Sequence, residues 1–97
     1  MELAETSTEF VHANVTATAQ GDPVTLSDPP EVAFVTGSGN PGPADWHAAE
    51  WDDSAARIMV GPEGGELTLT PGSYWMWIKW TAGTETPVHR AGRIRIY

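Results

Sequence analysis

Cysteine is absent from this sequence, and so is any long apolar run. Without cysteine the chain can form neither disulfides nor thiolate metal sites, and it offers no thiol nucleophile. We therefore expect a reducing compartment, because small secreted domains commonly depend on disulfides. No stretch approaches the roughly 18 apolar residues of a membrane-spanning helix, and acidic and polar residues follow Met1. The sequence thus predicts no transmembrane helix and no signal peptide.

Basic residues are scarce, with 5 Lys and Arg against 13 Asp and Glu, which gives a net charge of −8. Such a chain repels phosphates and anionic lipids, so we expect neither a nucleic-acid partner nor a membrane partner. The charge is also uneven. Residues 1–56 hold ten acids and no base (−10), whereas residues 57–97 hold five bases and three acids (+2). One acidic region and one mildly basic strand are what a self-complementary or docking module would present. The alternative is that any acidic protein has to place its few basic residues somewhere.

Ten glycines and eight prolines divide the 97 residues into short segments rich in β-branched and aromatic side chains. This pattern predicts one all-β domain, an immunoglobulin-like sandwich of about seven to eight antiparallel strands over residues 9–97. Residues 1–8 are expected to form a flexible N-terminal arm. The expected strands cover 9–19, 24–26, 31–36, 45–51, 56–60, 67–69, 74–80 and 88–97.

Period-two alternation in the last two strands predicts which side chains enter the core. The inward set is Tyr74, Met76, Ile78, Trp80, Ile94 and Ile96. The outward set is Trp75, Trp77, Lys79, Arg93, Arg95 and Tyr97. In the segment 45–51, Trp46 and Trp51 are five residues apart, so on a strand they point to opposite sides and we expect one of them in the core.

No set of residues in the sequence predicts catalysis or cofactor binding. His12, His47 and His89 are far apart, and none lies in a nucleophile motif. The glycine-rich segment 61–65 lacks the Lys-Ser/Thr and the helix of a phosphate loop. An acidic cluster could supply calcium ligands but lacks the spacing of a calcium loop; it consists of Asp45, Glu50, Asp52 and Asp53. We therefore expect no enzymatic activity, no cofactor and no metal.

The outward tryptophans allow two interpretations. They could merely cover the sheet through cross-strand cation–π contacts, worth about 0.5–1 kcal/mol each. They could instead form a protein interface, because Trp and Arg are enriched where binding energy concentrates. Two neighbouring outward indoles exceed what a monomer normally exposes, which favours the interface. Its expected residues are Trp75, Trp77, Arg90, Arg93, Arg95 and Tyr97.

Five motifs follow one another between residues 30 and 97: VAFV (32–35), DWHAAEW (45–51), ARIMVGPEGG (56–65), LTPGSYWMWIKWT (69–81) and ETPVHRAGRIRI (85–96). Together they resemble small virion-associated proteins of tailed phages that infect actinobacteria. In the resembled proteins a GDW–AEW element, a VGPGG turn and a closing TPV…AG.I.I strand follow in this order. The chain departs from the pattern in its Trp-rich strand 75–80 and its acidic N-terminal arm, and both departures leave the docking site open.

The resemblance implies an immunoglobulin-like structural protein from the head and connector region of a virion, without catalytic residues. The expected partners are major capsid or connector proteins, bound in many copies within a symmetric assembly. Head decoration or a minor capsid role, and a role in the head–tail connector, remain alternatives. From a different class, a carbohydrate-binding or host-adhesion module could use Trp75 and Trp77 as a platform for sugar rings.

Overall fold

The computed structural model describes residues 1–14, 18–19, 22–23, 28–37, 39–52, 55–81 and 84–97. The expected strand 24–26 and Asp53 lie outside these residues. In the described part, no helix is long and apolar enough to cross a membrane. The elements are β1 (Glu2–Leu3), β2 (Glu9–Asn14), β3 (Thr18–Ala19), β4 (Asp22–Pro23), β5 (Glu31–Val35), the 3₁₀ turn η1 (Pro43–Asp45), β6 (Trp46–Ala48), β7 (Glu50–Asp52), β8 (Ala55–Val60), β9 (Gly72–Lys79) and β10 (Val88–Ile96).

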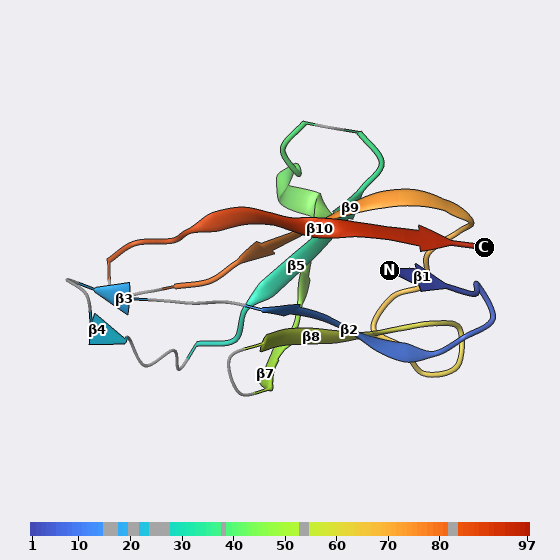
Figure 1. Ribbon diagram of the computed structural model, residues 1–97, viewed down its shortest axis with the longest axis horizontal. Helices are drawn as coiled ribbons and strands as arrows, with labels where there is room; N and C mark the ends of the chain where they lie inside the picture. Colours follow the sequence, from blue (N-terminus) through green and yellow to red (C-terminus); the bar gives the residue numbers. More distant parts are fainter. Residues whose placement is uncertain (15–17, 20–21, 24–27, 38, 53–54, 82–83) are drawn as a thin grey trace.

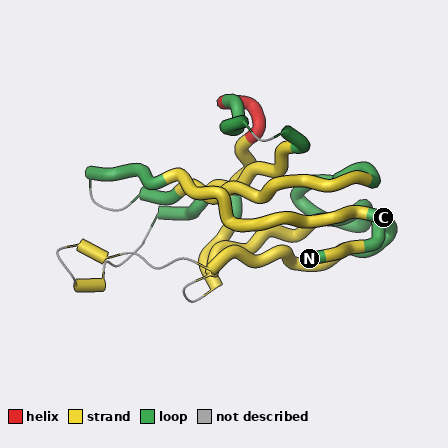
Figure 2. Tube along the Cα trace, turned by 45° about the horizontal axis from the view of Figure 1, so that its top comes forward, coloured by secondary structure: helices red, strands yellow, loops and turns green. Residues whose placement is uncertain are grey.

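The strands form a sandwich of two sheets (Figure 1). One sheet has the order β1-β10-β9-β5-β6 and the other has the order β2-β8-β7. Read as immunoglobulin strands, β5, β6, β9 and β10 take the places of C, C′, F and G, and β2, β7 and β8 those of B, D and E. The five-stranded sheet thus contains the strand order G-F-C-C′ found in variable-type immunoglobulin sandwiches. The predicted fold class, an all-β sandwich, is confirmed. A short β3–β4 hairpin stands apart at one end of the molecule (Figure 2).

The core lies between the two sheets and contains the side chains that the alternation assigned to it. All six predicted inward residues of β9, its C-terminal continuation and β10 are buried. The facing sheet contributes Val11, Ala13, Ala56, Ile58 and Val60. Burying an aliphatic or aromatic side chain of this kind contributes about 1.5–3 kcal/mol relative to leaving it exposed. The two alternating faces therefore hold the sheets together.

Tyr74 fixes the corner between β8 and β9. Its hydroxyl donates a hydrogen bond of 2.7 Å to the carbonyl oxygen of Thr70 and lies 3.0 Å from the Thr70 hydroxyl. A tyrosine near the start of strand F that bonds to backbone a few residues upstream is a hallmark of immunoglobulin-type sandwiches. The Thr70-Pro71-Gly72 turn and the following tyrosine thus carry a fold-specific signal within the sequence.

The segment 45–51 crosses from one sheet to the other. Its first half, β6, pairs with β5, and its second half, β7, pairs with β8. Trp51 packs against the core, and its indole N–H donates to the carbonyl of Asp28 at 2.8 Å. Trp46 pairs with Ala33, whose side chain faces away from the core. The prediction that these two tryptophans point to opposite sides, with one inward, is confirmed.

The N-terminal residues differ from the expected free arm. Glu2 and Leu3 form β1, which runs parallel to β10 in the register Glu2↔Arg95 and Leu3↔Ile96. Leu3 is only 3% exposed and belongs to the core cluster. The expectation failed because a single apolar side chain carries no periodicity, whereas burial of Leu3 at the open end of the sandwich is enough to hold the strand.

Gly61 explains how the 61–65 loop is held against the N-terminal segment. Its φ of +148° is rarely adopted by residues with a side chain, and a Cβ there would overlap the backbone of Ser7 and Thr8. The Thr8 hydroxyl accepts a 3.1 Å hydrogen bond from the backbone N–H of Glu63. The glycine-rich loop therefore serves close packing of two backbone segments.

Candidate interaction surface

The outer face of the five-stranded sheet carries the predicted interface residues in rows that run across the strands. One row consists of Trp46, Ala33, Trp77 and Arg90, and the next consists of Val35, Trp75 and Arg93. A third row holds Ala48, Glu31, Lys79 and Val88. Register partners share a face of the sheet, so three tryptophans and the arginines of β10 are gathered on one side of the molecule.

A β-bulge at Ala91 aligns the arginines. Arg90 is paired with Trp77 and Gly92 with Met76, so Ala91 is an extra residue in β10. Arg90 and Arg93 are an odd number of positions apart and would face opposite sides of a regular strand. The bulge places both on the outer face, beside Trp77 and Trp75 respectively. Gly92 next to the extra residue is a composition signal for such a bulge, which the sequence interpretation missed.

Trp75 is the centre of the arginine contacts. The guanidinium carbons of Arg90 and Arg93 lie 4.3 and 4.8 Å from the centre of its ring. Arg90 also lies 5.9 Å from the ring centre of Trp77, and Arg95 lies 6.0 Å from that of Tyr97. Each such contact is worth about 0.5–1 kcal/mol at an exposed position. The arrangement holds two exposed guanidinium groups over one half-buried indole. We call Trp75, Trp77, Arg90, Arg93, Arg95 and Tyr97 the Trp–Arg surface.

Trp77 faces outward, as expected, but it is not exposed. Its exposed fraction is 9%, and Ala33, its neighbour on β5, is fully buried. No described residue accepts a hydrogen bond from its buried indole N–H. The alternation identified the face correctly, but the lateral neighbours in the sheet decide the exposure. Trp77 therefore underlies the Trp–Arg surface and presents little area of its own.

Trp46 was not among the predicted interface residues, although it lies on the same face. The ammonium group of Lys79 sits 4.4 Å from its ring centre and 3.8 Å from a carboxylate oxygen of Glu31. In this part of the face, the charge of Lys79 is therefore already paired with that of Glu31. The sequence did indicate that one of Trp46 and Trp51 points outward, because the two are five residues apart on a strand. It did not indicate which of the two this is.

Exposed apolar side chains lie within and beside the Trp–Arg surface. Among the described residues, the large hydrophobic side chains that remain exposed are Met1, Val88 and Tyr97, at 59, 45 and 56%. Val88 is the first residue of β10 and Tyr97 directly follows its last residue, and the carbonyl of Met1 accepts a 2.9 Å hydrogen bond from the Arg95 N–H. A strand with apolar ends and arginines between them has the composition of a protein interface.

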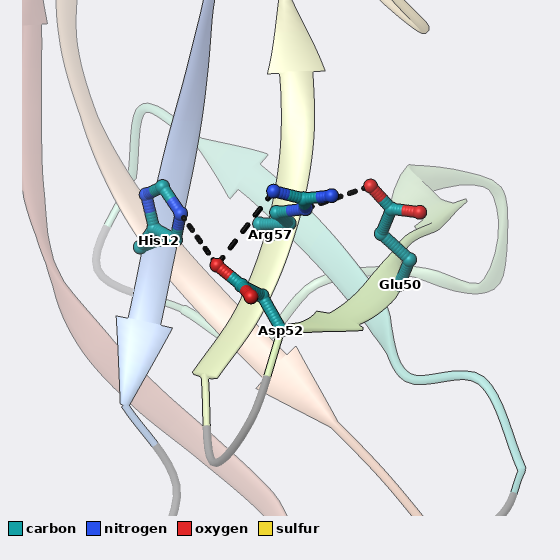
Figure 3. Close-up of polar contacts among 4 residues, drawn as sticks. All are labelled: His12, Glu50, Asp52 and Arg57. Atoms are coloured by element: carbon teal, nitrogen blue, oxygen red, sulfur yellow. Dashed lines mark hydrogen bonds and ion pairs between the residues drawn. The ribbon is translucent and has the colours of Figure 1, made fainter.

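The outer face of the opposite sheet carries a self-contained polar network (Figure 3). Arg57 bonds to Glu50 at 2.8 Å and lies 3.6 Å from Asp52, which in turn lies 3.7 Å from His12. The guanidinium of Arg57 also lies 4.1 Å over the ring of Phe10. Exposed ion pairs of this kind contribute about 0–1 kcal/mol each. The two carboxylates of the predicted acidic cluster on β7 thus face an arginine.

The remaining chemical candidates of the sequence are separated in the fold. His12, His47 and His89 lie on β2, β6 and β10, and His89 packs on Trp80 with ring centres 5.2 Å apart. Asp45 accepts a 2.8 Å hydrogen bond from the N–H of Gly42. Within the described residues, no three His, Asp or Glu side chains come together as a metal site. Comparisons with protein-family models, with curated proteins and with solved structures find no match.

Proposed function

We propose that this domain is a non-enzymatic virion structural protein that docks on the capsid shell or the head–tail connector through its Trp–Arg surface. The observation that carries the docking proposal is the concentration of exposed arginines and exposed apolar side chains along β10. Interfaces are enriched in these residue types, and one strand supplies them on one face. Docking there would stabilise junctions between subunits of the assembly.

The choice of a virion as the assembly rests on the motifs between residues 30 and 97. They resemble phage head and connector proteins, and that resemblance implies an immunoglobulin-like sandwich. The observed fold agrees with this implication. A symmetric shell would present the same docking site at each symmetry-related position, so one interface per domain would be enough to place many copies on a particle.

A sugar platform is less well supported by the geometry of the same face. A flat platform requires exposed indole faces, but Trp77 is buried. Two guanidinium groups already stack on Trp75. A sugar ring would have to displace at least one of these guanidinium groups before it could stack on Trp75.

Co-sedimentation with particles assembled without the protein tests the docking proposal. Trp75→Ser is expected to reduce association by about tenfold or more, because it removes the indole that supports Arg90 and Arg93. Phe10→Ser is the matched control, since Phe10 is also a half-buried aromatic residue beneath an arginine but belongs to the opposite sheet. Equal association of both variants would contradict docking through the Trp–Arg surface.

The copy number in the same experiment separates the two locations. Hundreds of copies per particle would indicate shell decoration, whereas about a dozen or fewer would indicate the connector, because each location imposes its own symmetry. Failure of the unmodified protein to bind particles, together with retention on a polysaccharide column, would replace the virion proposal with the carbohydrate-binding one.

A further inference from the structure

The five cationic side chains of the chain fall into two groups according to their carboxylate partners. Arg57 pairs with Glu50 and Asp52, Lys79 pairs with Glu31, and Arg95 lies 3.5 Å from Glu2. Arg90 and Arg93 have no carboxylate within 4.0 Å among the described residues.

These two arginines also contact the same aromatic ring. The bulge at Ala91 brings both to the outer face, and their guanidinium carbons lie over the ring of Trp75, 4.3 and 4.8 Å from its centre. The N–H donors of a guanidinium point outward in the plane of the group. A guanidinium whose flat face covers an aromatic ring therefore keeps these donors free to bond. Ordering a long side chain before binding also reduces the entropy lost when a partner docks. Arg90 and Arg93 therefore present donors suited to carboxylate oxygens.

We propose that Arg90, Trp75 and Arg93 form a carboxylate clamp that recognises an acidic segment of a protein partner. This inference rests on the proposed docking function and adds the chemistry of the partner. The clamp is flanked by the exposed side chains of Val88 and Tyr97, so the matching segment carries acidic residues between apolar ones. Charge complementarity of this kind sets the orientation and the rate of docking.

A protein carboxylate fits the surface better than a nucleic-acid backbone. A nucleic acid presents a continuous line of phosphates and is bound by an extended basic stripe. Here the cations on either side of the clamp, Lys79 and Arg95, already pair with Glu31 and Glu2. Only two guanidinium groups remain, in a chain of net charge −8.

A nuclear magnetic resonance titration with a synthetic glutamate-rich peptide tests the clamp. The indole N–H signal of Trp75 and the side-chain N–H signals of Arg90 and Arg93 are expected to shift on binding. Raising the salt concentration from about 50 to 300 mM should weaken the binding, because exposed charges are then screened. Arg90→Gln and Arg93→Gln are each expected to weaken peptide binding about three- to tenfold.

Arg57→Gln is the matched control. It lowers the net charge by the same one unit, from −8 to −9, and also removes an arginine stacked on an aromatic ring. It should change peptide binding less than about twofold, since it lies on the opposite sheet. If all three variants weakened peptide binding equally, the effect would come from the change in net charge alone, and the clamp proposal would be overturned. Tighter binding of an oligothymidine of equal charge at the same signals would also overturn it, in favour of a nucleic acid.

The clamp and the docking proposal can fail separately. Loss of particle association in Trp75→Ser, without any shift of the arginine signals by the acidic peptide, would refute the clamp and leave the docking proposal standing. Particle association that survives Trp75→Ser would refute docking through this surface. If the acidic peptide still shifted the arginine signals in that case, the result would support carboxylate binding by Arg90 and Arg93 without particle docking at this surface.

Discussion

At the scale of single residues, Trp75 and Trp77 show that two side chains on the same face of a strand can differ in exposure because their neighbours on the adjacent strands differ. Both project from the outer face of β9. Trp77 lies in the middle of the sheet between Ala33 and Arg90, and it is 9% exposed. Trp75 is half-buried and lies between Val35 and Arg93. The two residues therefore have different roles: Trp77 contributes to stability, and Trp75 supports the arginines.

Replacing both tryptophans by serine would not separate binding from folding. Trp77→Ser is expected to lower the free energy of unfolding by about 3–5 kcal/mol, as for other buried tryptophans that are truncated. Trp75→Ser should lower it by about 1 kcal/mol, mainly through the lost cation–π contacts. Urea denaturation of the single variants measures both values. Similar small losses in the two variants would show that Trp77 is not packed as the structure has it.

The face of each residue in β9 was predictable from the sequence, but its exposure was not. Alternation from Tyr74 to Trp80 determines the orientation, because successive side chains of a strand point to opposite sides. The burial of Trp77 depends on Ala33, which lies far away in the sequence and is aligned with it only by the pairing of β5 with β9. A pattern within one strand contains no information about such lateral neighbours.

At the scale of elements, β1 adds a parallel strand to the edge of the larger sheet. Its pairing with the end of β10 buries Leu3 beside the core. Leu3→Ala is expected to lower the free energy of unfolding by about 2–4 kcal/mol, because it leaves a cavity at a buried site. Glu2→Ala is the control on the same strand, and as an exposed substitution it should change stability by less than about 0.5 kcal/mol. If chemical denaturation showed that Leu3→Ala lowers the free energy of unfolding no more than Glu2→Ala does, residues 1–8 would be a free arm after all.

Elements with strong internal patterns were predictable, whereas β1 and the bulge in β10 were not. The alternating strands and the glycine and proline residues between them indicated an immunoglobulin-like sandwich. Strand β1 is two residues long and has no period to detect. The bulge inserts one residue into β10, so the side of Arg90 depends on pairing with β9 and cannot be obtained by counting back from Ile94.

At the scale of the whole molecule, the topology places strands of the acidic half of the sequence beside strands of the basic half within each sheet. Glu2 of β1 thereby meets Arg95 of β10, and Glu31 of β5 meets Lys79 of β9. On the outer face of the opposite sheet, Arg57 forms ion pairs with Glu50 and Asp52. Arg90 and Arg93 remain as a local basic site on an acidic domain.

Hydroxyl-radical footprinting of the particle-bound and the free protein tests the central claim most directly, since it requires no substitution. The docking account predicts that binding protects Trp75 and Tyr97 on the Trp–Arg surface. Phe10 and Met59, on β2 and β8 of the opposite sheet, should be oxidised equally in both states. Protection of Phe10 and Met59, with Trp75 and Tyr97 oxidised as in the free protein, would contradict docking through the Trp–Arg surface.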